Sequence, residues 1–117
     1  MCLRYVILRH DDVADPHFDL MFETAAESLL AAWRLPVWPL QQAVRIPRLG
    51  DHRRVYLDYQ GPLTDQRGSV RRITEGTCRL QVRSELLWEL TLLTPAPPCK
   101  MRLLAVTADV WSAAPVP

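Results

Sequence analysis

The stretch LRYVILRHDDVADPHFDLMFE, residues 3–23, decides the fold class, because two alternating runs flank a single turn. Alternation of apolar and polar residues is typical of half-buried β-strands, in which successive side chains point to opposite faces. Asp15-Pro16 interrupts the pattern, and both residue types favour turns. We therefore expect strands over residues 3–10 and 17–23, joined by a short connection.

Working outward, six further segments show a similar alternation. They are residues 28–35, 53–59, 68–74, 77–83, 86–94 and 100–107. Short strands that recur about every ten residues indicate an all-β fold, here a single antiparallel eight-stranded β-barrel. Glu75-Gly76 is expected to form a hairpin turn, since glycine readily takes positive φ. Residues 36–47 are expected to be irregular, with a short helical turn around 40–44.

The chain of 117 residues has the size of one domain, with 49% apolar and 23% charged residues. We expect its core to occupy about residues 3–107 and residues 108–117 to form a tail. No apolar run approaches the ~20 residues that span a bilayer. The first residues enter a strand pattern without the apolar core of a signal peptide, which predicts a cytoplasmic protein with no membrane partner.

The three cysteines, Cys2, Cys78 and Cys99, are far apart and lack the paired spacing of a zinc site. An odd number of widely separated cysteines fits reduced thiols better than a disulfide framework. We expect each of them to be a small buried or incidental residue.

Arginine dominates the basic residues: of 14, only Lys100 is a lysine, although the net charge is just +1. Two groups stand out, one with Arg45, Arg48, Arg53 and Arg54, the other with Arg67, Arg71 and Arg72. The planar guanidinium can donate two parallel hydrogen bonds to a phosphate, so the groups fit nucleic-acid contact. Solvated strand faces with a general preference for Arg over Lys are the alternative explanation.

His17 and Asp19 are two residues apart in an expected strand, so their side chains share a face. His10 ends the preceding expected strand, and antiparallel pairing would bring it beside His17. Two imidazoles and a carboxylate form a plausible divalent-metal site with open positions for water or substrate. A chance His-x-Asp spacing is the alternative.

His52 and Tyr56 form the second candidate pair, because in a regular strand residues four apart share a face, and Arg54 lies between them. An imidazole, a guanidinium and a phenol at one place could bind a phosphate and stabilise charge in its transition state. A polar surface strand is the alternative.

Taken in order, these segments resemble the 3′-phosphoesterase domain of bacterial DNA ligase D. The resemblance is carried by YVILRHD at 5–11, PHFDL at 16–20, AWRLP at 32–36, DHRRVY at 51–56 and YQGPL at 59–63. It covers about residues 4–107. With Asp-Leu-Met at 19–21, the chain is most similar to small stand-alone members of that family. Neither the sequence nor the resemblance identifies a protein partner, such as a repair ligase or polymerase.

The resemblance implies an eight-stranded barrel with a metal site in its concave face. It implies removal of a 3′-phosphate or 3′-ribonucleotide from DNA ends during repair. His10, His17 and Asp19 would bind Mn²⁺, although Zn²⁺ or another divalent cation would also suit them. The catalytic residues would be His52, Tyr56 and Arg54, and Arg45, Arg48 and Arg53 would contact the nucleic acid.

Two departures from the family bear on activity. Met21 occupies the position of an arginine two residues after Asp19, and a thioether cannot bind phosphate. The phosphate contact that is missing at position 21 would then fall to Arg54, Arg45 or Arg48. The second departure is Gly50, which stands where an acidic residue is usual in the family.

Two other functions are therefore considered beside a phosphoesterase. The first is a module that binds nucleic-acid ends with little or no turnover, as Met21 suggests. The second is a non-haem iron oxygenase, because His17, Asp19 and the distant His52 imitate its facial triad.

Overall fold

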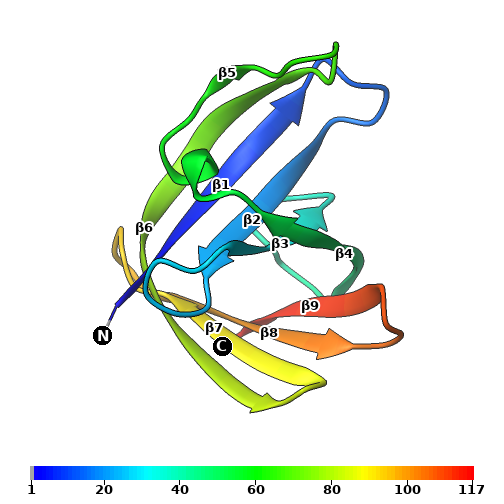
Figure 1. Cartoon of the computed structure of the whole chain (residues 1–117). Helices are drawn as coiled ribbons and strands as arrows, with labels where there is room; N and C mark the ends of the chain where they lie inside the picture. Colours follow the sequence, from blue (N-terminus) through cyan, green and yellow to red (C-terminus); the bar gives the residue numbers. More distant parts are fainter. Residues whose placement is uncertain (1) are drawn as a thin grey trace.

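The computed structural model describes residues 2–117, which fold into β-strands and one short 3-10 helix, η1 (Figure 1). The elements are β1 (Leu3–Asp11), β2 (His17–Glu23), β3 (Leu30–Leu35), β4 (Val44–His52), η1 (Arg54–Leu57), β5 (Gly61–Pro62), β6 (Ser69–Ser84), β7 (Leu87–Leu92), β8 (Cys99–Ala105) and β9 (Val110–Val116). Five expected strands agree with β1, β2, β3, β7 and β8 to within two residues at either end. Residues 2–117 contain no helix with the length and apolar character needed to cross a lipid bilayer.

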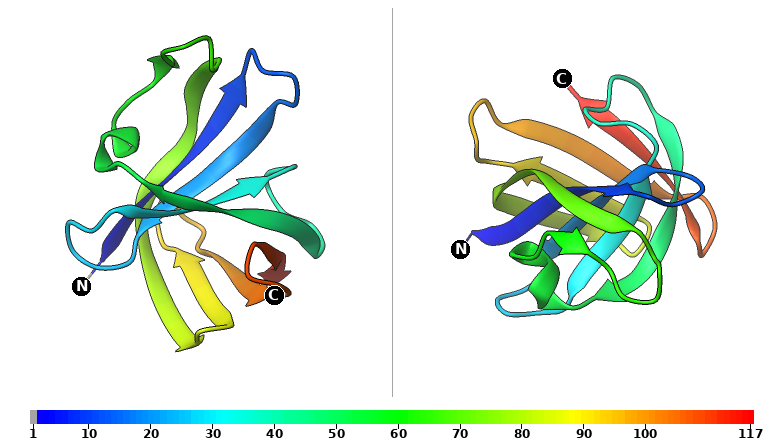
Figure 2. Two further views of the ribbon diagram at one scale, coloured as in Figure 1. Left: turned by 45° about the vertical axis from the view of Figure 1, so that its right-hand side comes forward. Right: turned by 90° about the horizontal axis from the view of Figure 1, so that it is seen from above.

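All nine strands belong to one antiparallel sheet, in the order β1-β2-β3-β4-β9-β8-β7-β6-β5. An additional pairing between β1 and β6 closes eight of them into a ring, and β5 lies outside it (Figure 2). The expectation of an all-β, antiparallel chain is therefore confirmed.

The hairpin turn expected at Glu75-Gly76 is wrong, because β6 continues through these residues as a single strand of 16 residues. Its first half pairs with β1 and its second half with β7. Glycine is required at position 76 for a different reason: an added Cβ would collide with the backbone oxygen of Thr94. A close approach of two backbones, rather than a turn, explains Gly76.

The strand expected over residues 53–59 is also wrong, because η1 begins at Arg54. The expected tail at 108–117 instead forms β9, which pairs with both β4 and β8 and completes the ring. Part of the segment expected to be irregular forms the start of β4. The helical turn expected around residues 40–44 is not present there, and η1 supplies the only helical turn within residues 2–117.

The core inside the ring draws residues from all eight strands and contains an aromatic group. Phe22 stacks on Trp33 at a centroid distance of 5.3 Å, and Trp33 meets Trp88 and Trp111 edge-on at 5.4 and 5.7 Å. Aromatic pairs of this kind contribute roughly 0.5–1.5 kcal/mol each beyond the burial of their surface. The aromatic group therefore fixes how β2, β3, β7 and β9 pack across the ring.

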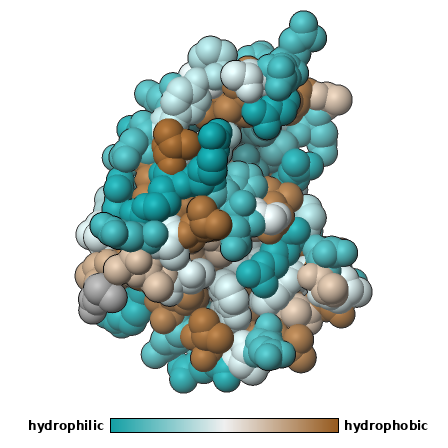
Figure 3. All heavy atoms as spheres, viewed as in Figure 1, coloured by the Kyte–Doolittle hydropathy of each residue, from teal (hydrophilic) through white to brown (hydrophobic). Residues whose placement is uncertain are grey.

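Strands β1–β3 are buried on both faces over most of their length, so they are not the half-buried strands that the alternating pattern predicts. Val6, Leu8, Met21 and Leu30 point away from the ring core and form a second cluster beneath Leu57 of η1. On the face of the molecule shown in Figure 3, the remaining hydrophobic residues are scattered among hydrophilic ones. The segment from η1 to β5 is thus a cover over the outer face of β1–β3, and the candidate site lies on that face.

Candidate metal centre

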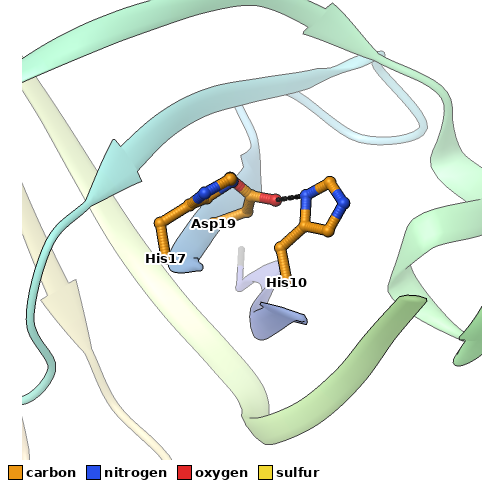
Figure 4. Close-up of side chains that lie close together, drawn as sticks. All are labelled: His10, His17 and Asp19. Atoms are coloured by element: carbon orange, nitrogen blue, oxygen red, sulfur yellow. Dashed lines mark ion pairs between the residues drawn. The ribbon is translucent and has the colours of Figure 1, made fainter. Parts of the chain in front are cut away.

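The β1–β2 hairpin brings the first candidate residues together, as the sequence predicts. His10 and His17 are directly paired across the hairpin, and Asp19 follows two residues later on the same face. One ligand atom from each of the three lies within 4.8 Å of the others, and the side chains converge in Figure 4. His17 and Asp19 are buried, and His10 is half-buried. This group could hold a metal ion.

Backbone carbonyls fix the tautomers of both imidazoles. His17 Nδ1 donates to the Asp15 carbonyl at 2.7 Å, and His10 Nε2 donates to the Arg67 carbonyl at 2.6 Å. A carbonyl can only accept, so each ring keeps a lone pair on its other nitrogen in the neutral form. Carbonyl partners of this kind orient histidine ligands in metal sites.

The free nitrogens point at a carboxylate, which also only accepts. His17 Nε2 lies 3.3 Å from Asp19 Oδ1, and His10 Nδ1 lies 3.6 Å from Asp19 Oδ2. His17 Nε2 and Asp19 Oδ1 are buried and have no hydrogen-bond partner. A cation between them, either a proton or a metal ion, removes this repulsion. The donor set suits a divalent ion and leaves coordination positions for water or substrate.

The site faces away from the ring core, which corrects the expectation of a metal in the concave face of a barrel. Residues 5, 7, 20 and 22 fill the ring, so the alternating residues 6, 8, 19 and 21 lie on the outer face. A cavity of about 130 Å³ opens there, beneath the cover formed by η1 and β5. It is lined by His10, Asp19, Met21, Arg34, Leu49, His52, Tyr56, Leu63, Arg67 and Val70.

His52 reaches this cavity because of an irregularity in β4. Ala32 pairs with Leu49 but Leu30 pairs with His52, so β4 has one extra residue in this interval. Such a bulge changes the face to which the following side chains point. Unbroken alternation from Leu49 would have turned His52 toward the ring core. Its Nδ1 donates to the Gly50 carbonyl at 2.7 Å, which leaves Nε2 available to a ligand.

Tyr56 lines the same cavity, although not for the predicted reason. It lies on η1 rather than four residues along a strand from His52. The turn of η1 brings the two rings to a centroid distance of 5.8 Å in an edge-on arrangement. His52 and Tyr56 therefore lie close together as predicted, but Tyr56 belongs to a 3-10 helix and not to a strand.

Arg54, predicted to act with this pair, binds a carboxylate instead. Its Nη1 lies 2.6 Å from Oε2 of buried Glu23 and also donates to the Ser28 carbonyl at 2.8 Å. The Arg4 backbone N–H donates to the other Glu23 oxygen at 2.6 Å. Burial raises the pKa of Glu23, but these donors together lower it below its usual value. Arg54 thus ties the start of η1 to the end of β2.

The three arginines predicted to contact nucleic acid lie in three different places. Arg48 points to the ring core, where its guanidinium lies 4.9–5.3 Å from the ring centroids of Trp33, Trp88 and Trp111. Arg53 is exposed and lines a neighbouring cavity of about 350 Å³ that shares Tyr56 with the first. Arg45 lines a third cavity, beside His17. The structure therefore separates Arg48 from the candidate site.

Sequence reasoning missed Arg34 and Arg67 as cavity residues. Arg34 is directly opposite Asp19 in the β2–β3 pairing, a position that could have been found by extending the hairpin pattern to the third strand. Arg67 belongs to the loop before β6, and nothing in the sequence indicates that its carbonyl would orient His10.

Comparison with known proteins assigns the chain to no family and no function. No protein-family model matches the chain, and no curated protein matches it significantly. The case for a function therefore depends on the site.

Proposed function

We propose that this chain is a divalent-metal-dependent phosphoesterase acting on the 3′ ends of DNA, where it removes a 3′-phosphate or a 3′-ribonucleotide. On this proposal, the ring of eight strands is the barrel of the ligase D 3′-phosphoesterase family. The observation that carries it is the pair of buried, unpartnered acceptors, His17 Nε2 and Asp19 Oδ1, beside a cavity that also contains His52 and two arginines.

The metal would be held by His10, His17 and Asp19. Mn²⁺ suits mixed imidazole and carboxylate ligands, although Zn²⁺ generally binds such sites more tightly. When bound, the metal supplies Lewis-acid polarisation of a phosphate oxygen and a more acidic water.

The protein groups around it have complementary roles. His52 keeps Nε2 free, so it can accept a proton from the attacking water or, once protonated, donate to the phosphate. The Tyr56 hydroxyl can donate to another phosphate oxygen. The guanidinium groups that line the cavity offset negative charge as it develops.

Met21 supports a second candidate, a module that binds nucleic-acid ends without turnover. Its side chain lines the cavity, and it offers no charge to a phosphate. An oxygenase would use the same donor types, because two histidines and one carboxylate also form the facial triad of non-haem Fe(II) enzymes. The His52, Arg34 and Arg67 side chains around the cavity favour an anionic substrate instead.

The test combines metal analysis with a primer assay. Wild type and the His17→Ala and Asp19→Asn variants are titrated with Mn²⁺ by calorimetry, then incubated with DNA primers that end in a 3′-phosphate or a 3′-ribonucleotide. Asp109→Asn is the matched control, because Asp109 is exposed and lies between β8 and β9, which do not pair with the ligand strands β1 and β2. We expect one Mn²⁺ per wild-type chain and a 3′-hydroxyl product, both lost in the two ligand variants and kept in the control.

The outcomes separate the candidates. Unchanged Mn²⁺ binding in both ligand variants, with circular dichroism like that of wild type, would overturn the metal assignment. Binding of Mn²⁺ and primer without product would favour the module. Consumption of oxygen that requires Fe²⁺ would favour the oxygenase.

A further inference from the structure

Arg34 is a cationic side chain with no anionic partner. Within residues 2–117 it makes no ion pair, and its Nε is buried without a hydrogen-bond partner. A buried donor left without an acceptor is unfavourable, and such groups in native proteins usually have a function. The half-buried guanidinium of Arg34 therefore keeps donors available for a partner that residues 2–117 do not supply.

Its position shows where that partner would lie. Arg34 pairs directly with Asp19 across β2 and β3, and opposite residues in an antiparallel sheet have neighbouring side chains. Both Asp19 oxygens, however, face the imidazoles of His10 and His17. Arg34 lines the 130 Å³ cavity with Asp19 and His52, and it also lines the cavity beside His17. Its charge is thus available to an anion placed next to the metal ligands.

The other candidate cations are already engaged. Arg54 binds Glu23, Arg48 packs among three tryptophans, and Arg67 donates to the Thr64 carbonyl and hydroxyl at 3.1 Å each. Met21, the residue next to the ligands on β2, carries no charge. Arg34 and Arg67 are the two arginines that line this cavity, and of the two only Arg34 makes no side-chain hydrogen bond within residues 2–117.

We propose that Arg34 is the residue that binds the terminal phosphate of a nucleic-acid 3′ end, so that the site selects a phosphorylated terminus over a 3′-hydroxyl one. This inference rests on the proposed function and adds the group that recognises its substrate. A terminal phosphate monoester carries between one and two negative charges near pH 7. A guanidinium can donate two parallel hydrogen bonds to it, which lysine cannot.

The experiment compares the dissociation constants of two oligonucleotides of one sequence, ending in a 3′-phosphate or a 3′-hydroxyl. They are measured by fluorescence anisotropy in EDTA, where no turnover is expected, and again with Mn²⁺ only over the interval before gels detect product. The proteins are wild type, Arg34→Met, Arg34→Lys and Arg79→Met. Arg79 is an exposed arginine of β6 outside the cavity, so its variant has the same charge change. Calorimetric titration with Mn²⁺ verifies that each variant retains its metal site.

We expect wild type and Arg79→Met to prefer the 3′-phosphate by at least about tenfold, the low end of what charge-assisted hydrogen bonds provide. Arg34→Met should reduce this preference to about twofold or less while Mn²⁺ binding persists. Arg34→Lys should fall between the two, because it keeps the charge and loses the planar fork.

A wild type without preference, or an Arg34→Met variant that prefers the 3′-phosphate as strongly as wild type, overturns the assignment. If Arg34→Met loses the preference but wild type never cleaves the primer, the role of Arg34 in phosphate binding is supported and the proposed phosphoesterase activity is refuted. If Arg34→Met cleaves the primer and prefers the 3′-phosphate as wild type does, only the role of Arg34 is refuted.

Discussion

Replacing Arg54 by methionine tests the attachment of η1 to the sheet. The carboxylate of Glu23 is buried, with 5% of the residue exposed, and accepts from the Arg54 guanidinium and the Arg4 backbone N–H, both at 2.6 Å. Arg54→Met removes the side-chain donor to that carboxylate and leaves only backbone donors, and it also frees the Ser28 carbonyl. Methionine retains most of the aliphatic volume, so the variant chiefly removes hydrogen bonds and charge.

The magnitude follows from these contacts. A hydrogen bond to a charged group contributes about 1.5–3 kcal/mol. The Arg54 side chain is 34% exposed, and solvent screening reduces the value for a partly exposed pair. We therefore expect the free energy of unfolding to fall by about 1–2 kcal/mol, or roughly 4–8 °C in Tm for a domain of this size.

The pH dependence makes the prediction specific. The pKa of Glu23 in the folded protein lies below its ordinary value of 4.5, despite the opposing effect of burial. The stabilisation is therefore complete above pH 4.5 and is lost as the pH falls through the lowered pKa. Urea unfolding at pH 7 should show the full difference between wild type and Arg54→Met, and unfolding near pH 3 a much smaller one.

Arg53→Met is the matched control, because Arg53 is the exposed neighbour in sequence and makes no ion pair within residues 2–117. If Arg54→Met is as stable as this control at pH 7, or if the difference persists unchanged in acid, the assigned role of the Glu23–Arg54 pair is wrong.

Three further predictions concern the rest of the fold. Burial raises the pKa of the Cys78 thiol to about 12, so a thiol reagent at pH 8 should modify exposed Cys2 at once and Cys78 only in denaturant; equal rates in the native protein would contradict this. Gly76→Ala should lower the unfolding free energy by at least about 2 kcal/mol, because the added Cβ collides with the Thr94 backbone. Gly50 has open space around it, so Gly50→Ala should change the unfolding free energy by less than about 1 kcal/mol, and thermal denaturation compares the two variants. Arg48→Met should destabilise the protein by about 1–2 kcal/mol and alter tryptophan fluorescence, since it removes contacts with three indole rings, while Mn²⁺ binding stays as in wild type; loss of metal affinity would refute its placement in the core.

The parts of the fold that the sequence predicts are those set by local patterns. The β1–β2 hairpin follows from alternation on either side of Asp15-Pro16, and it determines that His10 meets His17. The metal group could be predicted for that reason, because all three side chains belong to one hairpin.

The parts that could not be predicted depend on contacts between distant segments. The residues around Gly76 read the same whether the glycine forms a turn or lies against the Thr94 backbone. Only the path of the β7–β8 connection, which contains Thr94, distinguishes these two possibilities. The β4 bulge that turns His52 to the cavity appears only when β3 and β4 are paired. Arg54 does not join His52 and Tyr56 as predicted, because Glu23, distant in sequence, binds its guanidinium.

The position of β9 has a consequence for synthesis of the chain. This strand lies between β4 and β8, so both keep an unpaired edge until residues 110–116 leave the ribosome. The hairpin that carries His10, His17 and Asp19 is translated well before residues 110–116, which form the second neighbour of the strand that carries His52. A nascent chain can therefore bring these three side chains together early, but the ring that supports the opposite wall of the cavity closes only after residues 110–116 have been synthesised.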